Sequence, residues 1–195
     1  LSPSDTKEIK KNSVPEAYKG AEWKGKLYAY PYAEQAQTVY YDKSKLSPED
    51  VKSWKTMTSK GVVATDFTNA YVMWPVMFSA GTKLFGDSGE EVKGSTFDSQ
   101  NGVNAMKWYA EQKNNKGVMQ TSNALNQLKK GHAQAILDGP WNAANIKKIL
   151  GKNLGVAPYP TIELGGKTAQ MEAFLGIECF LILLTLRMLQ YWLNT

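Results

Sequence analysis

Short runs of β-branched and aromatic residues alternate along the chain with segments that begin with helix-capping residues. The runs expected to form strands are 26–30, 36–41, 62–65, 133–137 and 154–159. The segments expected to form helices are 47–58, 70–80, 100–114, 121–130 and 140–150. Strands that alternate with helices in this way are typical of an α/β layered fold, in which helices cover a sheet.

Local signals predict where several of these elements begin and end. Pro31 is expected to break the polypeptide between the first two strands. Ser47-Pro48-Glu49-Asp50 has a capping Ser, a Pro at the first helical position and two acids in the first turn, so a helix is expected to run from here to Thr58. Asp98 is expected to cap the helix over 100–114, and the residues predicted on its inner face are Val103, Met106 and Ala110.

Composition excludes several classes of function. At 43% hydrophobic and 21% charged residues, the 195-residue chain can bury a core. Its net charge of +5 comes almost entirely from scattered lysines. These form no basic stripe interleaved with aromatics, so nucleic acid is not an expected partner, although an anionic cell surface would suit this charge. With Cys179 as the single cysteine, the chain has no internal disulfide and no Cys/His metal pattern, and we expect neither a metal nor a cofactor.

Catalytic signals are weak. The single histidine, His132, stands beside Gly131 at an expected helix end, where a surface position is the simplest interpretation. Neither a Gly-x-Ser-x-Gly elbow nor a glycine-rich phosphate loop is present. Glycoside hydrolysis needs two carboxylates that face one cleft, and the sequence does not place any two acids together. The acids near expected strand ends are Glu34, Asp66, Asp138 and Glu172.

Aromatic and amide residues stand where expected strands end. Asn69-Ala70-Tyr71 and Gly139-Pro140-Trp141 each follow a strand and open a helix, and Gln35 lies in the break near Pro31. In open α/β sheets, ligands bind beyond the carboxyl ends of the strands. A pyranose ring offers an apolar face to aromatic rings and hydroxyl groups to amides. These residues therefore suggest a sugar site, although core packing of Trp141 is an equal alternative from the residues alone.

The other tryptophans are expected to serve the core. Trp54, Trp74 and Trp108 lie within expected helices at apolar spacing, whereas Trp141 falls in the first turn of a helix opened by Gly-Pro.

A family resemblance adds to this interpretation. In order and spacing, several segments resemble the extracellular solute-binding proteins of ABC sugar importers, of the maltose and maltodextrin-binding type. The resemblance covers about residues 10 to 180. The segments that carry it are Gly25-Lys26-Leu27-Tyr28-Ala29-Tyr30-Pro31, Tyr40-Tyr41-Asp42-Lys43-Ser44-Lys45-Leu46, the stretch from Lys130-Gly131 to Asp138-Gly139-Pro140-Trp141, Val156-Ala157-Pro158-Tyr159-Pro160 and Phe174-Leu175-Gly176.

The resemblance implies a periplasmic-binding-protein-like (type II) lobe, a mixed sheet flanked by helices, with an incomplete second lobe. Residues 1–41 would be the end of the N-terminal lobe and the first crossover, and residues 42–180 the sugar-binding C-terminal lobe. Trp141 would stack on the sugar and Tyr71 would contact it. Asn69 and Gln35 stand where the maltose binder has glutamates, which keeps hydrogen-bonding capacity and removes charge.

The function implied is that of a non-catalytic carbohydrate-binding component that closes on maltose or maltodextrin-like oligosaccharides between two lobes. Its partner would be an ABC permease in the membrane. Its location would be the extracellular cell surface, as a lipoprotein whose anchor is not in this chain. A glycoside-acting enzyme that uses cleft carboxylates, and a structural fragment that dimerises through its C-terminal tail, remain as alternatives.

The two ends of the chain depart from this pattern. After Phe180 the sequence leaves the family, and we interpret residues 181–195 as an aberrant tail that arose from a reading-frame shift near Leu181. The apolar run over 174–193 contains Glu178 and Arg187 and is a poor candidate for a transmembrane segment. The chain starts at Leu1 without a leader, so we expect that a leader was removed or that the chain is an excised piece.

Overall fold

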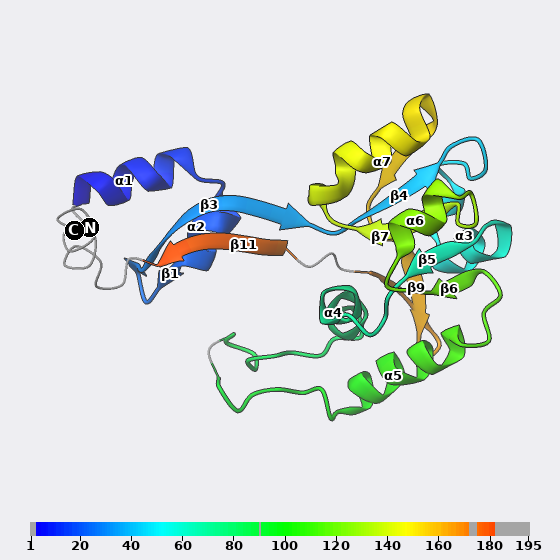
Figure 1. The fold of residues 1–195 in the computed structure, drawn as a ribbon. Helices are drawn as coiled ribbons and strands as arrows, with labels where there is room; N and C mark the ends of the chain where they lie inside the picture. The colour runs from blue at the N-terminus through cyan, green and yellow to red at the C-terminus, as the bar shows by residue number, and fades with distance from the viewer. Residues whose placement is uncertain (1–2, 90, 172–174, 182–195) are drawn as a thin grey trace, which may run out of the picture. The chain divides into compact units, whose positions relative to one another are not determined.

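The computed structural model describes residues 3–89, 91–171 and 175–181, the last stretch by its backbone alone (Figure 1). The chain divides into two compact units. Unit 1 consists of Leu1–Gln35 and Leu175–Thr195, and unit 2 of Ala36–Phe174. The lobe boundaries expected after residues 41 and 180 lie within a few residues of these divisions, and the assignment of the units to two lobes stays a prediction.

Unit 1 combines short helices with two small sheets. Its elements are α1 (Pro3–Asn12), α2 (Pro15–Ala21), β1 (Glu22–Trp23), β2 (Lys26–Leu27), β3 (Ala29–Ala36) and β11 (Leu175–Leu181). Strands β1 and β2 form an antiparallel hairpin, and β3 pairs with β11. Lys24 and Gly25 in the hairpin turn both have positive φ, 47° and 73°, as the tightest hairpin turns require.

The predicted break at Pro31 is wrong, because β3 runs through it. Proline lacks only the backbone N–H donor. Within the described residues β3 has one neighbouring strand, so the missing donor can face the side that carries no ladder hydrogen bonds.

Unit 2 is built on a five-stranded mixed sheet with the order β6-β5-β7-β4-β8. Its strands are β4 (Thr38–Asp42), β5 (Val63–Thr65), β6 (Val118–Gln120), β7 (Ala135–Asp138) and β8 (Leu154–Ala157). Strand β5 is parallel to β6 and β7, whereas β4 is antiparallel to both β7 and β8. Strands β5 to β8 therefore end at one edge of the sheet, the carboxyl edge, where β4 begins. At the opposite amino edge β4 ends and the others begin.

Helices cover both faces of this sheet, α4 and α5 on one side and α6 and α7 on the other (Figure 1). Alternate residues of β4 enter different cores, since Val39 and Tyr41 pack with α3, α4 and α5 while Tyr40 packs with α6 and α7. Burying one such side chain contributes about 1.5–3 kcal/mol. The helices are α3 (Trp54–Lys60), α4 (Ala70–Ser79), α5 (Gln100–Gln112), α6 (Ala124–Lys129) and α7 (Ala143–Leu150).

The remaining elements of unit 2 are short. Strands β9 (Thr161–Leu164) and β10 (Lys167–Gln170) form an antiparallel hairpin, and both glycines of its turn, Gly165 and Gly166, have positive φ. The 3-10 turns are η1 (Asp50–Lys52), η2 (Pro140–Asn142) and η3 (Gly151–Asn153).

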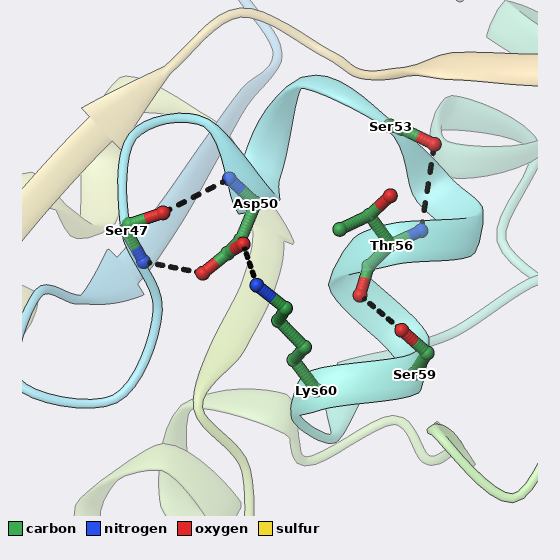
Figure 2. A network of polar contacts seen from close by, with 6 residues as sticks. All are labelled: Ser47, Asp50, Ser53, Thr56, Ser59 and Lys60. Carbon is green, nitrogen blue, oxygen red and sulfur yellow. Dashed lines mark hydrogen bonds and ion pairs between the residues drawn. The ribbon is translucent and has the colours of Figure 1, made fainter.

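The continuous helix expected over 47–58 is wrong (Figure 2). Ser47 and Asp50 do cap each other, with Ser47 N donating to Asp50 Oδ2 at 2.9 Å and Asp50 N donating to Ser47 Oγ at 3.2 Å. The turn then stops because Ser53 is extended and forms a parallel bridge with Thr161. Ser53 restarts the helix as the N-cap of α3, where its Oγ accepts a hydrogen bond from Thr56 N.

Two expectations for α5 are also wrong. Its N-cap is Ser99 rather than Asp98. The predicted inner face is largely exposed, with Val103 at 42% and Met106 at 54%, while the buried side carries Gly102, Ala105, Trp108 and Gln112. Both stripes have helical spacing, and the stripe that carries the large indole side chain of Trp108 faces inward. Gly102 contributes to this choice, because any Cβ there would come within 1.9 Å of the Phe97 carbonyl oxygen.

Core tryptophans were predicted more successfully. Trp54 and Trp108 are buried and lie 5.3 Å apart between ring centroids, as expected for core residues, whereas Trp74 is half-buried. Among the described residues, no helix combines the length and the apolar character needed to cross a membrane. Of the apolar run over 174–193, residues 175–181 are described, as strand β11, and of the predicted aberrant tail only Leu181 is described.

Candidate ligand-binding site

A cavity of about 290 Å³ opens at the carboxyl edge of unit 2. Three polypeptide segments line it, each directly after a parallel strand, which is where ligands bind in sheets of this kind. The polar and aromatic residues that line it are Asp66, Asn69 and Tyr71 after β5, Thr121, Ser122 and Asn123 after β6, and Asp138, Trp141 and Asn142 after β7. The structure therefore brings together three of the four predicted site residues: Asn69, Tyr71 and Trp141.

The aromatic part of the cavity is a pair of rings from different segments. The centroids of Tyr71 and Trp141 lie 5.2 Å apart with their planes at 57°, which is a tilted contact rather than a parallel stack. Trp141 is 52% exposed. Pro140 opens the 3-10 turn that carries the indole, and it follows β7 by one residue. An exposed indole at a cavity wall offers an apolar face to a ligand.

Asn69 is tied to the start of α4. Its side-chain Oδ1 accepts a hydrogen bond from Tyr71 N at 2.9 Å, which makes Asn69 the N-cap of this helix. The cap fixes the first turn of α4, where Tyr71 stands. One lone pair of Oδ1 is used in this way, which leaves the second lone pair and the two N–H donors of Nδ2 for contacts with a ligand.

Two carboxylates line the cavity. Oδ1 of Asp66 accepts from Thr68 N at 3.0 Å, from Thr68 Oγ1 at 2.6 Å and from Gln120 Nε2 at 2.9 Å. Asp138 accepts from Gly139 N at 2.8 Å through Oδ1 and from Asn142 Nδ2 at 2.9 Å through Oδ2. Asp138 thus braces its own loop, Asp66 braces its own loop and ties it to the end of β6, and both add negative charge to the cavity wall.

This electrostatic environment acts on nearby tyrosines. Burial raises the pKa of Tyr71, and the charge of Asp138 raises it further. The same two causes, in the same order, raise the pKa of Tyr40. Both phenols consequently stay protonated and can donate hydrogen bonds throughout the neutral range.

Two residues that the sequence pattern does not single out, Gln37 and Tyr40, position the aromatic pair. Gln37, buried just before β4, donates from Nε2 to the backbone carbonyl of Tyr71. Tyr40 donates from its hydroxyl to the carbonyl of Gly139 at 3.3 Å, beside Trp141. The one available signal was Gln37, a glutamine within an otherwise strand-like run. A sequence pattern does not show whether such a glutamine is buried or exposed.

The polar segment after β6 was misassigned in part. The helix expected over 121–130 begins later in the chain, because α6 spans Ala124–Lys129 and its N-cap residue is Asn123. Thr121 instead accepts a hydrogen bond at Oγ1 from Asn123 N, 3.1 Å away, within a segment that lines the cavity. Three consecutive polar residues directly after a parallel strand were the signal that could have identified it.

The remaining candidates lie elsewhere. Gln35 belongs to unit 1, so its role as a ligand contact stays a prediction. The side chains of Glu34 and Glu172 fall outside the described residues. His132 is exposed, with Nδ1 3.0 Å from Gln127 Oε1, which confirms a surface position at the end of α6. Within the described part of the chain, no cluster of His, Cys, Asp and Glu could hold a metal ion.

Comparison with known proteins identifies the fold. The chain is 66% identical to the maltodextrin-binding protein MalE1 from L. casei BL23, solved without ligand, with a TM-score of 0.86 over 93% of this chain and 48% of that one. This match confirms the predicted α/β fold, a type II periplasmic-binding-protein lobe with an incomplete second lobe.

Curated relatives agree. A maltooligosaccharide ABC transporter solute-binding lipoprotein of Streptococcus pneumoniae R6 is 31% identical over 180 residues, which are 81% of this chain and 41% of the relative. The maltodextrin-binding protein MdxE of Bacillus subtilis 168 is 29% identical over 168 residues, 74% of this chain and 40% of the relative. The chain therefore spans about two fifths of the length of these relatives, which are solute-binding proteins, a class without catalytic activity. Residues 1–186 match the family described as bacterial extracellular solute-binding protein, and the chain belongs to that family.

Proposed function

We propose that this chain is part of the non-catalytic carbohydrate-binding component of an ABC importer and that unit 2 contacts maltodextrin-like oligosaccharides at its carboxyl edge. The observation that carries the proposal is the Tyr71–Trp141 pair beside a cavity otherwise lined by carboxylates, amides and hydroxyls. Such a wall matches a pyranose, which has an apolar face of C–H groups and an equator of hydroxyls.

The chemistry of the wall sets the expected strength of binding. Covering about 60 Å² of the indole of Trp141 with a sugar face contributes roughly 1.5 kcal/mol at about 25 cal/mol/Å². The Asn69 amide can donate to sugar hydroxyls, while Asp66 and Asp138 can accept from them. One stacked ring with a few hydrogen bonds falls well short of the roughly −8 kcal/mol that micromolar affinity requires. We therefore expect weak binding by this chain alone.

The relatives support the identity of the ligand and of the partner. MalE1 and MdxE are named for maltodextrin, and the pneumococcal relative is named as a lipoprotein of a maltooligosaccharide ABC transporter. On this basis we propose for this chain an extracellular location at the cell surface, a maltodextrin-like ligand and a membrane permease as its partner. Self-association through the tail is not part of the proposal, because residues 182–195 lie outside the described structure.

In this proposal unit 2 is the sugar-binding C-terminal lobe, and unit 1 belongs to the N-terminal lobe and its crossover. Gln35 of unit 1 remains a ligand contact on the strength of the resemblance. Closure of two lobes around the sugar would then create the form that the permease recognises.

A hydrolytic alternative has one observation in its favour, since Asp66 and Asp138 line the same cavity. Hydrogen-bond donors from their own loops hold both carboxylates, which suits acceptors of sugar hydroxyls better than a catalytic acid and base. Turnover of a chromogenic maltoside by the purified chain, abolished by Asp138→Asn, would restore the hydrolytic alternative.

Indole NMR signals offer a direct test, because the side-chain N–H of each tryptophan reports weak as well as tight binding. Titration with maltotriose should shift the Trp141 signal, assigned through its disappearance in Trp141→Phe, and cellobiose should shift it less. Trp141→Ala should abolish the shifts that maltotriose causes in the signals of the other tryptophans. Trp23→Ala, in unit 1 and similarly exposed at 49%, should leave those shifts intact. An undiminished response in Trp141→Ala would exclude the proposed site.

A further inference from the structure

The amino edge of the unit 2 sheet, opposite the cavity, gathers three loops. Asp42 N at the end of β4 donates to Gln134 O at 2.9 Å, and Lys43 N donates to Asn153 O at 2.8 Å. Gln134 Nε2 in turn donates to Gly131 O at 3.1 Å. The loop after β4, the turn after α6 and the turn after α7 are therefore neighbours on one surface (Figure 1).

These three loops carry a group of exposed lysines, which we call the lysine edge. All of these lysines are exposed. Each one lies either within two residues of a backbone contact that joins the loops or at the end of α6. The members are Lys43, Lys45, Lys129, Lys130 and Lys152.

Two acids lie near this edge, of which Asp42 keeps its charge and offsets part of that of the lysines, while Asp50 is paired with Lys60. Asp42 accepts from Ser44 N at 2.8 Å and from Ser44 Oγ at 2.7 Å. Asp50 pairs with Lys60 at 2.5 Å, as Figure 2 shows. In the described part of the chain the recorded ion pairs use Lys52, Lys60 and Lys83, so none neutralises the lysine edge.

The carboxyl edge has the opposite charge. Asp66 and Asp138 line the cavity there, and the described residues around it include no lysine. Unit 2 is thus electrically polarised along its strands, with acids at the ligand cavity and an excess of lysines over acids at the far end. In a negative surface potential such a body orients with its lysine end toward the surface.

We propose that the lysine edge is an adsorption surface for anionic phospholipid, which holds unit 2 on a membrane with its ligand cavity facing the surrounding medium. Lysine ammonium groups are flexible point charges, and each contributes roughly a fivefold gain in binding near an anionic bilayer. The lysines come from three separate loops and line none of the recorded cavities of the described residues. A broad array of this kind suits a planar sheet of phosphates rather than a linear polymer held in a groove.

Co-sedimentation of the full chain with vesicles provides the test. Phosphatidylcholine vesicles that contain phosphatidylglycerol should bind the chain, and pure phosphatidylcholine vesicles should not. About 0.5 M salt should release it, because the screening length then falls to a few ångströms. Replacing the five lysines of the lysine edge by Gln should lower the partition coefficient by at least about tenfold.

A matched control separates position from net charge. Gln replacement of five exposed lysines elsewhere, Lys26, Lys55, Lys93, Lys107 and Lys167, removes the same charge and should lower partition by less than about threefold. Circular dichroism would verify that both variants are folded. Equal losses in the two variants would overturn the proposal, as would wild-type binding that does not depend on phosphatidylglycerol. Binding to soluble polyphosphate that is stronger than binding to the vesicles, and lost with the same five lysines, would overturn the choice of lipid.

Discussion

Gly139 lies against the indole of Trp141. A Cβ at position 139 would come 2.2 Å from Cη2 and Cζ3 of that ring, closer than any real contact allows. Gly139 also offers its carbonyl to the hydroxyl of Tyr40 and its N–H to the carboxylate of Asp138. The absence of a side chain at this position therefore sets where the indole stands at the cavity wall.

We expect Gly139→Ala to displace the indole and to destabilise the fold by about 1–3 kcal/mol, the usual cost of overpacking. The maltotriose response of the Trp141 signal should be lost with it. Trp141→Phe removes the ring atoms that clash, so Gly139→Ala should cost less in the Trp141→Phe background. Urea denaturation of the four proteins in this double-mutant cycle measures the coupling, and additive effects would show that the two residues do not interact.

The cap at the start of α4 allows a second prediction. Asn69→Ala removes the acceptor for Tyr71 N and should lower the free energy of unfolding by about 1 kcal/mol. Asn69→Asp keeps a carboxylate acceptor at the cap and should retain most of that stability. In the proposed site it also replaces the Nδ2 donors by an acceptor, so its sugar response should differ from that of the wild type. Equal stability of all three proteins would argue against the cap.

Asp50 gives a pH dependence with a definite sign. The hydrogen bond from Lys60 and those from Ser47 lower the pKa of Asp50 from 3.8 to about 2. A carboxylate whose pKa is lower in the folded state stabilises the fold fully at pH values above the unfolded pKa. That stabilisation is lost as the pH falls from about 4 to about 2.

Asp50→Asn should therefore be less stable than the wild type at neutral pH, and the difference should shrink through this window of pH. Thermal unfolding at a series of pH values measures it. Glu49→Gln serves as the control, because Glu49 and its partner Lys52 are both exposed at the surface. A difference between Asp50→Asn and the wild type that stays constant down to pH 2 would contradict the assigned role of Asp50.

Much of the ligand-binding wall could be predicted from residue order. Asn69, Tyr71 and Trp141 follow strands and open helices, and parallel strands bring such positions to the same edge of a sheet. Local chemistry also identified strands at 62–65 and 133–137, since short runs of apolar residues between breakers have few other stable arrangements. Thr121, Ser122 and Asn123 escaped notice because capping and ligand contact require the same residue types.

Other features depend on contacts that sequence periodicity does not contain. Helix α5 has two apolar stripes, and the close approach of the Phe97 carbonyl to Gly102 contributes to the choice of the Trp108 side as the buried one. The helix expected from Ser47 ends after one turn because Ser53 pairs with Thr161, more than a hundred residues away.

The sequence by itself determined the α/β class, most strand positions and the aromatic residues at the cavity, because these follow from local propensity and from alternation along the polypeptide. Only the tertiary structure decided that Gln37 and Tyr40 position the Tyr71–Trp141 pair, and that scattered lysines from three loops share one edge. The physical reason is that both groupings arise from pairing between strands distant in sequence. The free energy of such pairing depends on every element that packs around it.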